Sequence, residues 1–462
     1  MSLRIDGGRG RNRTGDKGFA GLCITTLLPS QSETILLKYN KYYATIQNLF
    51  GFNSLMTSLY SQKFIGYNAS KNPISEEAIN ISYQNLRHDI LRKKIAPINV
   101  VEQEGDLAGF QKIAQDLASF NKIYILGVGG SSLGGKTLSV LGNDDRLEFV
   151  ESIDPKAINN ILEKIDIAKS FFVIISKSGE TIETICQTLI VKKYLADKGV
   201  KDFAKKFLFV TQDLNNSIGK IANELDCQIA HHPNDVGGRY SCFSIVGMLP
   251  SILAGVDAKA IRVGARKILD SFLNEDWIKQ SCYNQLAFYQ DGFVSNVIMP
   301  YIDDLKNFTD WYRQLWAESL GKNGFGSTPI NSMGTIDQHS QLQLYMAGPK
   351  DKFFTFIVNK NHNLDFLVED IKNCSTIFGG KNLSEIVKIE QDTTIECLSQ
   401  KDLPIRIIEL PKFDEEILGG LMMQMFLETI LIAYAKNIDP FDQPAVEERK
   451  VMAKGLLNRT LS

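Results

Sequence analysis

Hydroxyl groups and an ammonium group gather at residues 176–181, whose sequence is Ser-Lys-Ser-Gly-Glu-Thr. The run at residues 171–176 is continuous, apolar and rich in β-branched side chains, which predicts a parallel-sheet strand that is buried on both faces. A helix beginning after this strand would offer backbone N–H groups and the positive end of its dipole to an anion, and Lys177 adds a full charge. The turn is therefore a candidate site for a phosphate monoester, although an ordinary capped helix start has similar residues.

A second candidate phosphate turn, residues 127–135, has the sequence Gly-Val-Gly-Gly-Ser-Ser-Leu-Gly-Gly. Its glycines let the backbone approach a ligand closely, and a helix start after it would again present N–H groups to an anion. Residues 130–137 also match the P-loop pattern of an NTPase, which would place Lys136 on the nucleotide phosphates. Such an enzyme needs an aspartate after a buried strand to hold magnesium, whereas the best strand ends in Ser176 and Lys177, so this alternative is disfavoured.

Glu318 is the candidate proton acceptor. Residues 303–320 have the apolar spacing of a helix, and Gln314 and Glu318 lie four positions apart, so their side chains share one side of it. Glu318 would lie in the last turn, where the negative end of the helix dipole opposes ionisation and favours proton uptake by the carboxylate. A solvated glutamate at a helix end is the ordinary alternative.

Three further residues are candidates for acid–base or electrostatic roles. Arg239 follows two glycines, which suits a guanidinium group directed at an oxyanion. His339 lies in a polar stretch, where an imidazole can act as a proton shuttle. Lys450 comes seven positions after Gln443, so both side chains would lie on nearly the same face of a helix that begins there.

The composition argues against several classes of protein. The 462-residue chain has 51 basic and 53 acidic residues and no basic block beyond its N-terminal tail, which argues against a nucleic-acid partner or a membrane surface. The seven cysteines show no CxxC pair and no paired spacing with the five histidines. They favour small buried side chains in a reducing cytoplasm over a disulfide framework or a zinc site.

Short apolar runs alternate with helical spacers in two parts of the chain. This alternation predicts right-handed βαβ units, and hence an α/β fold with parallel sheets covered by helices on both faces. Ligands of such sheets bind beyond the carboxyl ends of the strands, so the cleft between the two units is the expected site. The predicted strands are residues 122–128, 146–151, 171–176 and 206–212 in the first unit and 294–300, 353–359 and 404–410 in the second.

These patterns divide the chain into six segments. We expect a disordered tail, an N-terminal helical segment, a first α/β domain, a helical bridge, a second α/β domain and a C-terminal helical arm, at residues 1–30, 31–115, 116–256, 257–290, 291–435 and 436–462, respectively. The N-terminal helices are expected at residues 33–59 and 75–94. Residues 417–435 are apolar enough for a membrane span, but polar and glycine interruptions and the lack of positive flanks favour a buried helix.

Six sequence blocks, in this order, resemble the phosphoglucose isomerase family, whose members interconvert glucose 6-phosphate and fructose 6-phosphate in glycolysis and gluconeogenesis. The blocks are GVGGSSLGG, SKSGETIET, GGRYSCFSIVGMLP, QLWAESLGKNG, GTIDQHSQLQL and NIDPFDQPAVEERK. The resemblance runs from the glycine-rich turn to the C-terminal helix. It implies two tandem sugar-isomerase (SIS) domains, each a three-layer αβα sandwich, with the active site between them.

The resemblance also implies roles for individual residues. Glu318 would move a proton between C2 and C1, Arg239 would stabilise the enediolate, and the pair that opens the sugar ring would be His339 and Lys450. The residues implied in phosphate and substrate binding are Gly130, Ser131, Ser176, Lys177, Ser178, Thr181, Gln314 and Gln443. Members of the family are homodimers in which the histidine of one subunit completes the site of the other, and they use no metal or organic cofactor.

A non-catalytic SIS-type sensor that only binds phosphosugars is an alternative of a different class. It would keep both phosphate turns and would not need Glu318, His339 or Arg239. Aldose–ketose isomerisation, in contrast, needs a carboxylate that takes and returns a proton, a cation beside the developing oxyanion, and an acid–base pair for ring opening. The sequence contains candidates for each of these tasks, so we expect an isomerase.

Overall fold

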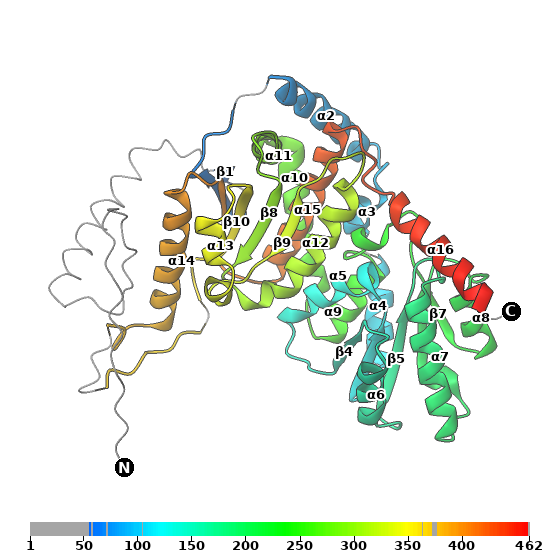
Figure 1. The fold of residues 1–462 in the computed structure, drawn as a ribbon. Coiled ribbons are helices and arrows are strands. Elements are labelled where there is room, and N and C mark those ends of the chain that lie inside the picture. Colours follow the sequence, from blue (N-terminus) through cyan, green and yellow to red (C-terminus); the bar gives the residue numbers. More distant parts are fainter. Residues whose placement is uncertain are drawn as a thin grey trace, which may run out of the picture. The chain divides into compact units, whose positions relative to one another are not determined.

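The computed structural model describes residues 55–56, 59–70, 73–103, 105–362, 364–371 and 377–460. The tail expected at residues 1–30 and most of the helix expected at residues 33–59 lie outside these ranges. The end of that predicted helix is wrong, because Leu55–Met56 forms strand β1. The described part of the chain contains two β-sheets with associated helices (Figure 1).

The first sheet contains five parallel strands in the order β4-β3-β5-β6-β7. The strands are β3 (Lys122–Leu126), β4 (Leu147–Val150), β5 (Ser170–Ile175), β6 (Phe207–Thr211) and β7 (Gln228–His231). Every residue of the central strand β5 is buried, as its unbroken apolar run predicts. The sequence does not predict β7, because this edge strand is short, half polar and partly exposed.

Alternate residues of these strands build two separate cores, one on each face of the sheet. Phe172 of β5 belongs to a cluster with residues of helix α7 (Ile182–Asp197). Its neighbours Phe171 and Val173 point to the other face and belong to a cluster with helix α9 (Ile245–Leu253). The other helices of this half are α4 (Gly105–Asp116), α5 (Leu133–Leu138), α6 (Pro155–Lys164) and α8 (Ser217–Glu224).

The second sheet has the order β1-β2-β11-β10-β8-β9. Its parallel strands are β8 (Ser295–Pro300), β9 (Thr328–Asn331), β10 (Lys352–Asn359) and β11 (Ile405–Leu410). Strand β2 (Ser61–Ile65) pairs antiparallel with β11. The prediction of a helical segment over residues 31–115 is therefore wrong at this strand. The physical reason is that β2 satisfies backbone groups that would otherwise remain unpaired along β11.

The remaining helices precede, accompany and follow the second sheet in the described part of the chain, which ends at residue 460. They are α2 (Pro73–Leu91), α3 (Ala96–Asn99), α10 (Ala258–Asn274), α11 (Trp277–Gln290), α12 (Lys306–Leu320), α13 (Leu342–Ala347), α14 (Leu383–Ser399), α15 (Glu415–Ala435) and α16 (Pro444–Thr460). Short 3₁₀ turns are η2 (Val100–Glu102), η3 (Gly129–Ser131), η4 (Ser139–Leu141), η5 (Phe203–Lys205), η6 (Gly238–Tyr240), η7 (Asp303–Leu305) and η8 (Ile336–His339).

Helix α15 is long and apolar enough to cross a membrane by length and composition, yet 94% of its most apolar window is buried inside the protein. It packs against α2, α10, α11 and α12. The prediction of a buried helix is therefore confirmed. Gly419 permits the contact with α10, because a Cβ atom there would lie 2.0 Å from the carbonyl oxygen of Ile261.

Candidate active site

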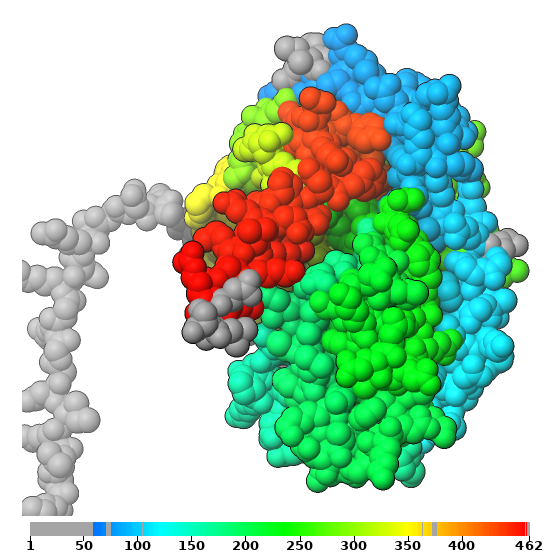
Figure 2. Space-filling view, turned by 90° about the vertical axis from the view of Figure 1, so that its right-hand side faces the viewer, coloured from blue at the N-terminus to red at the C-terminus, as the bar shows by residue number. Residues whose placement is uncertain are grey.

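A cleft of about 780 Å³ lies beyond the carboxyl ends of β3, β5 and β6 and is also bounded by α12 and α16. Figure 2 shows α16, in red, against the green surface of the first sheet's part of the chain. Most of the predicted site residues line this cleft, namely Gly130, Ser131, Lys177, Ser178, Thr181, Arg239, Gln314, Glu318, Gln443 and Lys450. Ser176 and His339 are not among its lining residues.

The turn at residues 176–181, called the phosphate turn below, joins β5 to α7. Thr181 is the residue before the helix, and its side chain makes no capping hydrogen bond, so it leaves the first N–H groups of α7 available to a ligand. Gly179 has φ +65°, a left-handed conformation that glycine adopts without strain. Ser176 is buried, and its Oγ lies 3.3 Å from Oγ1 of Thr181, so it supports the turn from beneath.

Lys177 is half-buried at the start of this turn. Burial lowers the pKa of its ammonium group, and the carboxylate of Asp235 partly opposes this shift. An ammonium group that has lost part of its hydration interacts more strongly with an anion than an exposed one does. Lys177 is therefore well placed to pair with a phosphate group.

The glycine-rich turn at η3 packs directly against η6, which carries Arg239. A Cβ atom on Gly130 would lie 2.3 Å from the carbonyl carbon of Gly238, so only glycine permits this approach. The Oγ of Ser241 donates a hydrogen bond of 3.1 Å to the carbonyl of Gly130 and fixes the two turns to each other.

Lys136 does not take the position that a P-loop enzyme requires. Its Nζ lies 2.8 Å from Oε2 of Glu151, and Ser132 donates a hydrogen bond of 2.6 Å to the other oxygen of that carboxylate. Lys136 is not among the residues that line the cleft. The geometry thus gives the NTPase alternative no support.

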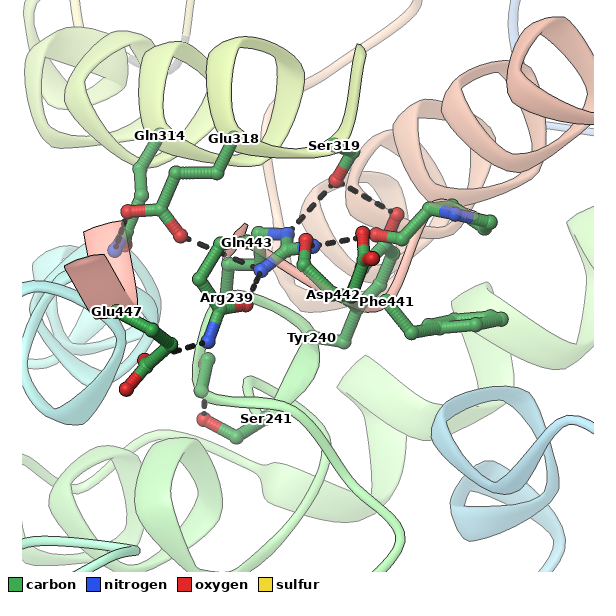
Figure 3. Close-up of polar contacts among 12 residues, drawn as sticks. Arg239, Tyr240, Ser241, Gln314, Glu318, Ser319, Phe441, Asp442, Gln443 and Glu447 are labelled. Carbon is green, nitrogen blue, oxygen red and sulfur yellow. Dashed lines mark hydrogen bonds and ion pairs between the residues drawn. The ribbon is translucent and has the colours of Figure 1, made fainter. Parts of the chain in front are cut away.

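Arg239 connects the end of α12 to the segment before α16, as Figure 3 shows. Its guanidinium group is buried, and all five of its N–H donors have acceptors. The acceptors are Oγ of Ser319 at 2.8 Å, Oε2 of Glu318 at 3.4 Å, Oε1 of Gln443 at 2.8 Å, and the carbonyl oxygens of Pro440 and Asp442 at 2.5 and 2.9 Å.

Both carboxylate oxygens of Glu318 are oriented by neighbours. Nε2 of Gln314 donates to Oε1 at 3.1 Å, and Arg239 lies at Oε2, while the side chain remains 30% exposed toward the cleft. Gly129 leaves room for this arrangement, because a Cβ atom there would lie 3.0 Å from Nε2 of Gln314. A carboxylate held beside a guanidinium group can move a proton while the cation stabilises a nearby negative charge.

Helix α16 brings further charged groups to the cleft. Gln443 immediately precedes it, and Lys450 forms an ion pair of 2.7 Å with Glu447 on the cleft side. His339, by contrast, is exposed in η8, and a single chain does not bring it to Glu318.

The cleft also contains residues that the sequence analysis did not single out. They include Gln212, Glu183, Arg449 and Lys454. The position of Gln212 directly after β6 was a signal, since ligands bind beyond the carboxyl ends of strands. The spacing of Lys454, four residues after Lys450, was a second signal in the sequence, because side chains four positions apart lie on the same side of a helix.

The chain matches known proteins over most of its length. The sequence model of the Phosphoglucose isomerase family matches residues 108–461. A probable glucose-6-phosphate isomerase of Methanococcus maripaludis is 37% identical over 348 residues, which cover 72% of this chain and 78% of the relative. A glucose-6-phosphate isomerase of Methanocaldococcus jannaschii is 33% identical over 403 residues, with coverages of 84% and 96%. A third relative, from Campylobacter jejuni, is 35% identical over 358 residues, with coverages of 74% and 87%.

Two solved structures are similar in fold. A hypothetical protein from Thermus thermophilus superimposes with a TM-score of 0.77 at 26% identity, covering 83% of this chain and 97% of that one. A glucose-6-phosphate isomerase from Chlamydia trachomatis gives a TM-score of 0.72 at 19% identity, with coverages of 89% and 90%. Together with the strand pairing, these similarities confirm the predicted α/β fold with parallel sheets.

Proposed function

This chain belongs to the phosphoglucose isomerase family, and we infer that it is an aldose–ketose isomerase that interconverts glucose 6-phosphate and fructose 6-phosphate. The observation that carries this conclusion is one cleft in which the phosphate turn lies together with the Glu318 carboxylate and the Arg239 guanidinium group. A phosphosugar sensor would not need the contact between these two groups.

We assign the phosphate group of the substrate to the turn that begins α7. Hydroxyl groups of Ser178 and Thr181, the ammonium group of Lys177 and the first N–H groups of the helix supply donors for its oxygens. Ser131 lines the cleft from the neighbouring glycine-rich turn. Binding energy from this remote group would orient the open-chain sugar, so that C1 and C2 reach Glu318.

Glu318 is the proposed base. It takes the proton from C2 of the open-chain aldose while O1 gains a proton, which gives a cis-enediol. The same carboxyl group then returns its proton to C1 while O2 loses one, which gives the ketose. Each half of the reaction removes one proton from the substrate and adds one, so residues that transfer protons are sufficient for the isomerisation.

Arg239 is the proposed stabiliser of the negative charge. In the resting site its Nη1 faces Oε2 of Glu318. When Glu318 accepts the proton, its negative charge is lost, and a negative charge develops on the substrate oxygen O1 until O1 itself is protonated. The guanidinium group therefore keeps one anionic partner throughout, without having to be reoriented.

We propose further that the protein acts as a homodimer and that His339 and Lys450 open the sugar ring, with His339 supplied by the other subunit. His339 is exposed, and nearby Ile336 and Leu344 are 63% and 51% exposed. Exposed aliphatic side chains beside a residue suited to proton transfer are typical of a surface that a second subunit covers.

Mixing two inactive variants would test this shared site. Glu318→Gln and His339→Ala dimers, mixed after dissociation, are expected to regain about a quarter of wild-type activity, because about half of the dimers are mixed and one of their two sites is intact. Glu318→Gln mixed with Arg239→Lys should stay inactive, because these two residues serve the site of the same chain. No recovery in verified mixed dimers would show that His339 does not complete the partner's site.

We place the protein in the cytoplasm. Five cysteines in the described part of the chain, Cys186, Cys227, Cys242, Cys282 and Cys397, are unpaired thiols. Unpaired cysteines are typical of a reducing compartment.

A coupled assay tests the proposed reaction directly. With fructose 6-phosphate as substrate and a glucose-6-phosphate dehydrogenase as reporter, we expect NADPH formation that a chelator does not reduce, because proton transfer by Glu318 requires no metal. The reporter reaction, started with glucose 6-phosphate, is the control for the chelator. Absence of turnover would overturn the proposed function, and loss of turnover that a divalent metal restores would overturn the metal-free mechanism.

A further inference from the structure

Glu180 is a fixed carboxylate within the phosphate turn. Its Oε1 accepts hydrogen bonds from the backbone N–H of Ser217 at 2.9 Å and from its hydroxyl group at 2.8 Å. These hydrogen bonds lower the pKa of Glu180, so the group is ionised at neutral pH. Glu180 also lines the cleft. A phosphate group that binds to this turn therefore meets a negative charge that is held in place.

Lys454 provides a positive charge at this point from a distant part of the chain. Its Nζ lies 3.2 Å from Oε2 of Glu180, which is 274 positions earlier in the sequence. Lys454 lies on α16, one helical turn after Lys450, and both side chains line the cleft. The pair thus connects α16 to the phosphate turn, consistent with the red helix against the green surface in Figure 2.

The charges of the cleft show why the phosphate group needs a further cation. A phosphate monoester carries a charge of about −1.5 to −2 near neutral pH. Arg239 faces Glu318, and Lys450 faces Glu447. Without Lys454, Lys177 and Arg449 would have to balance the phosphate group together with the carboxylates of Glu180 and Glu183, which also line the cleft.

We propose that Lys454 is a further phosphate-recognition residue, which Glu180 positions beside the phosphate turn and which pairs with the phosphate group of the substrate. This proposal rests on the isomerase function inferred above. The lysine side chain is long and 57% exposed, so its ammonium group can turn from the carboxylate to the phosphate oxygens without movement of the backbone. Glu180 keeps its two hydrogen bonds from Ser217 when Lys454 leaves it.

Opposite effects of two substitutions provide the test. Lys454→Met is expected to raise the Kd of inorganic phosphate, measured by calorimetry, and the KM for fructose 6-phosphate by about fivefold to tenfold, with kcat within about twofold. Glu180→Gln is expected to lower the Kd of inorganic phosphate by about twofold to threefold, because it removes a competing anion and releases Lys454. Lys454→Arg should retain most of the affinity, since it keeps the charge.

Lys193→Met is the matched control, because it removes an exposed lysine that is paired with Asp197 on α7 and lies outside the cleft. An unchanged Kd in Lys454→Met would overturn the proposal. A loss of affinity in Glu180→Gln as large as that in Lys454→Met would also overturn it, because the pair would then be only structural. The phosphate Kd requires no turnover, so it distinguishes failure of this proposal from failure of the isomerase function.

Discussion

Replacing Glu318 by glutamine is expected to lower kcat for isomerisation by about a hundredfold to ten-thousandfold, the range that a positioned general base contributes. Glutamine has the shape of glutamate and can keep a hydrogen bond to Gln314, but its amide group does not take the proton from C2. The Kd of inorganic phosphate should change by less than about threefold, because other residues bind that group. Steady-state kinetics and calorimetry measure the two quantities.

A partial reaction makes this test more specific. The wild-type protein should release part of the C2 hydrogen of the substrate into solvent, because the protonated carboxyl group of Glu318 can exchange its proton with water before it returns the proton to C1. Glu318→Gln should lose this exchange together with isomerisation. Glu183→Gln is the matched control, because Glu183 is another carboxylate of the same cleft and has no ion pair with Arg239. An unchanged kcat in Glu318→Gln, or an equal loss in Glu183→Gln, would refute the assignment of Glu318 as the base.

The sequence was most informative where a local pattern determines the structure. The strand β5 is buried on both faces, so its apolar run is unbroken, and the polar turn after it must lie at the carboxyl edge of the sheet. Glu318 could be placed at the end of a helix because the apolar spacing of α12 ends at Leu320. Strand ends and helix ends of this kind identified several of the residues that line the cleft, among them Lys177, Thr181 and Glu318.

The parts that could not be predicted depend on contacts between distant segments. Arg239 binds the carbonyl oxygen of Pro440, which is 201 positions away, and no local pattern indicates such a partner. The short strands β7 and β9 become strands by pairing with β6 and β8, since their own sequences are partly polar. The phosphate turn was predicted as a unit, but Ser176 is buried beside Thr181 and is not among the residues that line the cleft.

A buried ion pair holds the second sheet to the central helix α15. Arg406 of β11 and Glu428 of α15 have exposed fractions of 1% and 0%. Nη1 of Arg406 lies 2.8 and 2.7 Å from the two oxygens of Glu428. The same carboxylate accepts hydrogen bonds from three further side chains, those of Ser281 at 2.8 Å, Gln285 at 3.1 Å and Gln424 at 2.8 Å.

Glu428→Gln is expected to lower the free energy of unfolding by about 3–5 kcal/mol, the effect of removing one partner of a buried ion pair. The substitution leaves the charge of Arg406 without a counter-charge in an interior where it has little access to water. Glutamine also replaces one acceptor oxygen by an NH₂ group that faces existing donors. Chemical denaturation measures the free energy, and the residual folded protein should retain its kcat, because Glu428 does not line the cleft.

A double variant without either charge shows whether Glu428→Gln is destabilised by the unpaired charge of Arg406 or by lost packing. Arg406→Met combined with Glu428→Leu should recover most of the stability, because apolar groups of similar volume need no counter-charge. Recovery will be incomplete, since Gln285 loses its carboxylate acceptor, whereas Gln424 keeps partners in Gln62 and Tyr60. Lys193→Ala, which breaks an exposed ion pair, should change the free energy of unfolding by less than about 0.5 kcal/mol. If Glu428→Gln and the double variant lose the same amount of unfolding free energy, the destabilisation is due to lost packing, because the double variant contains no uncompensated charge.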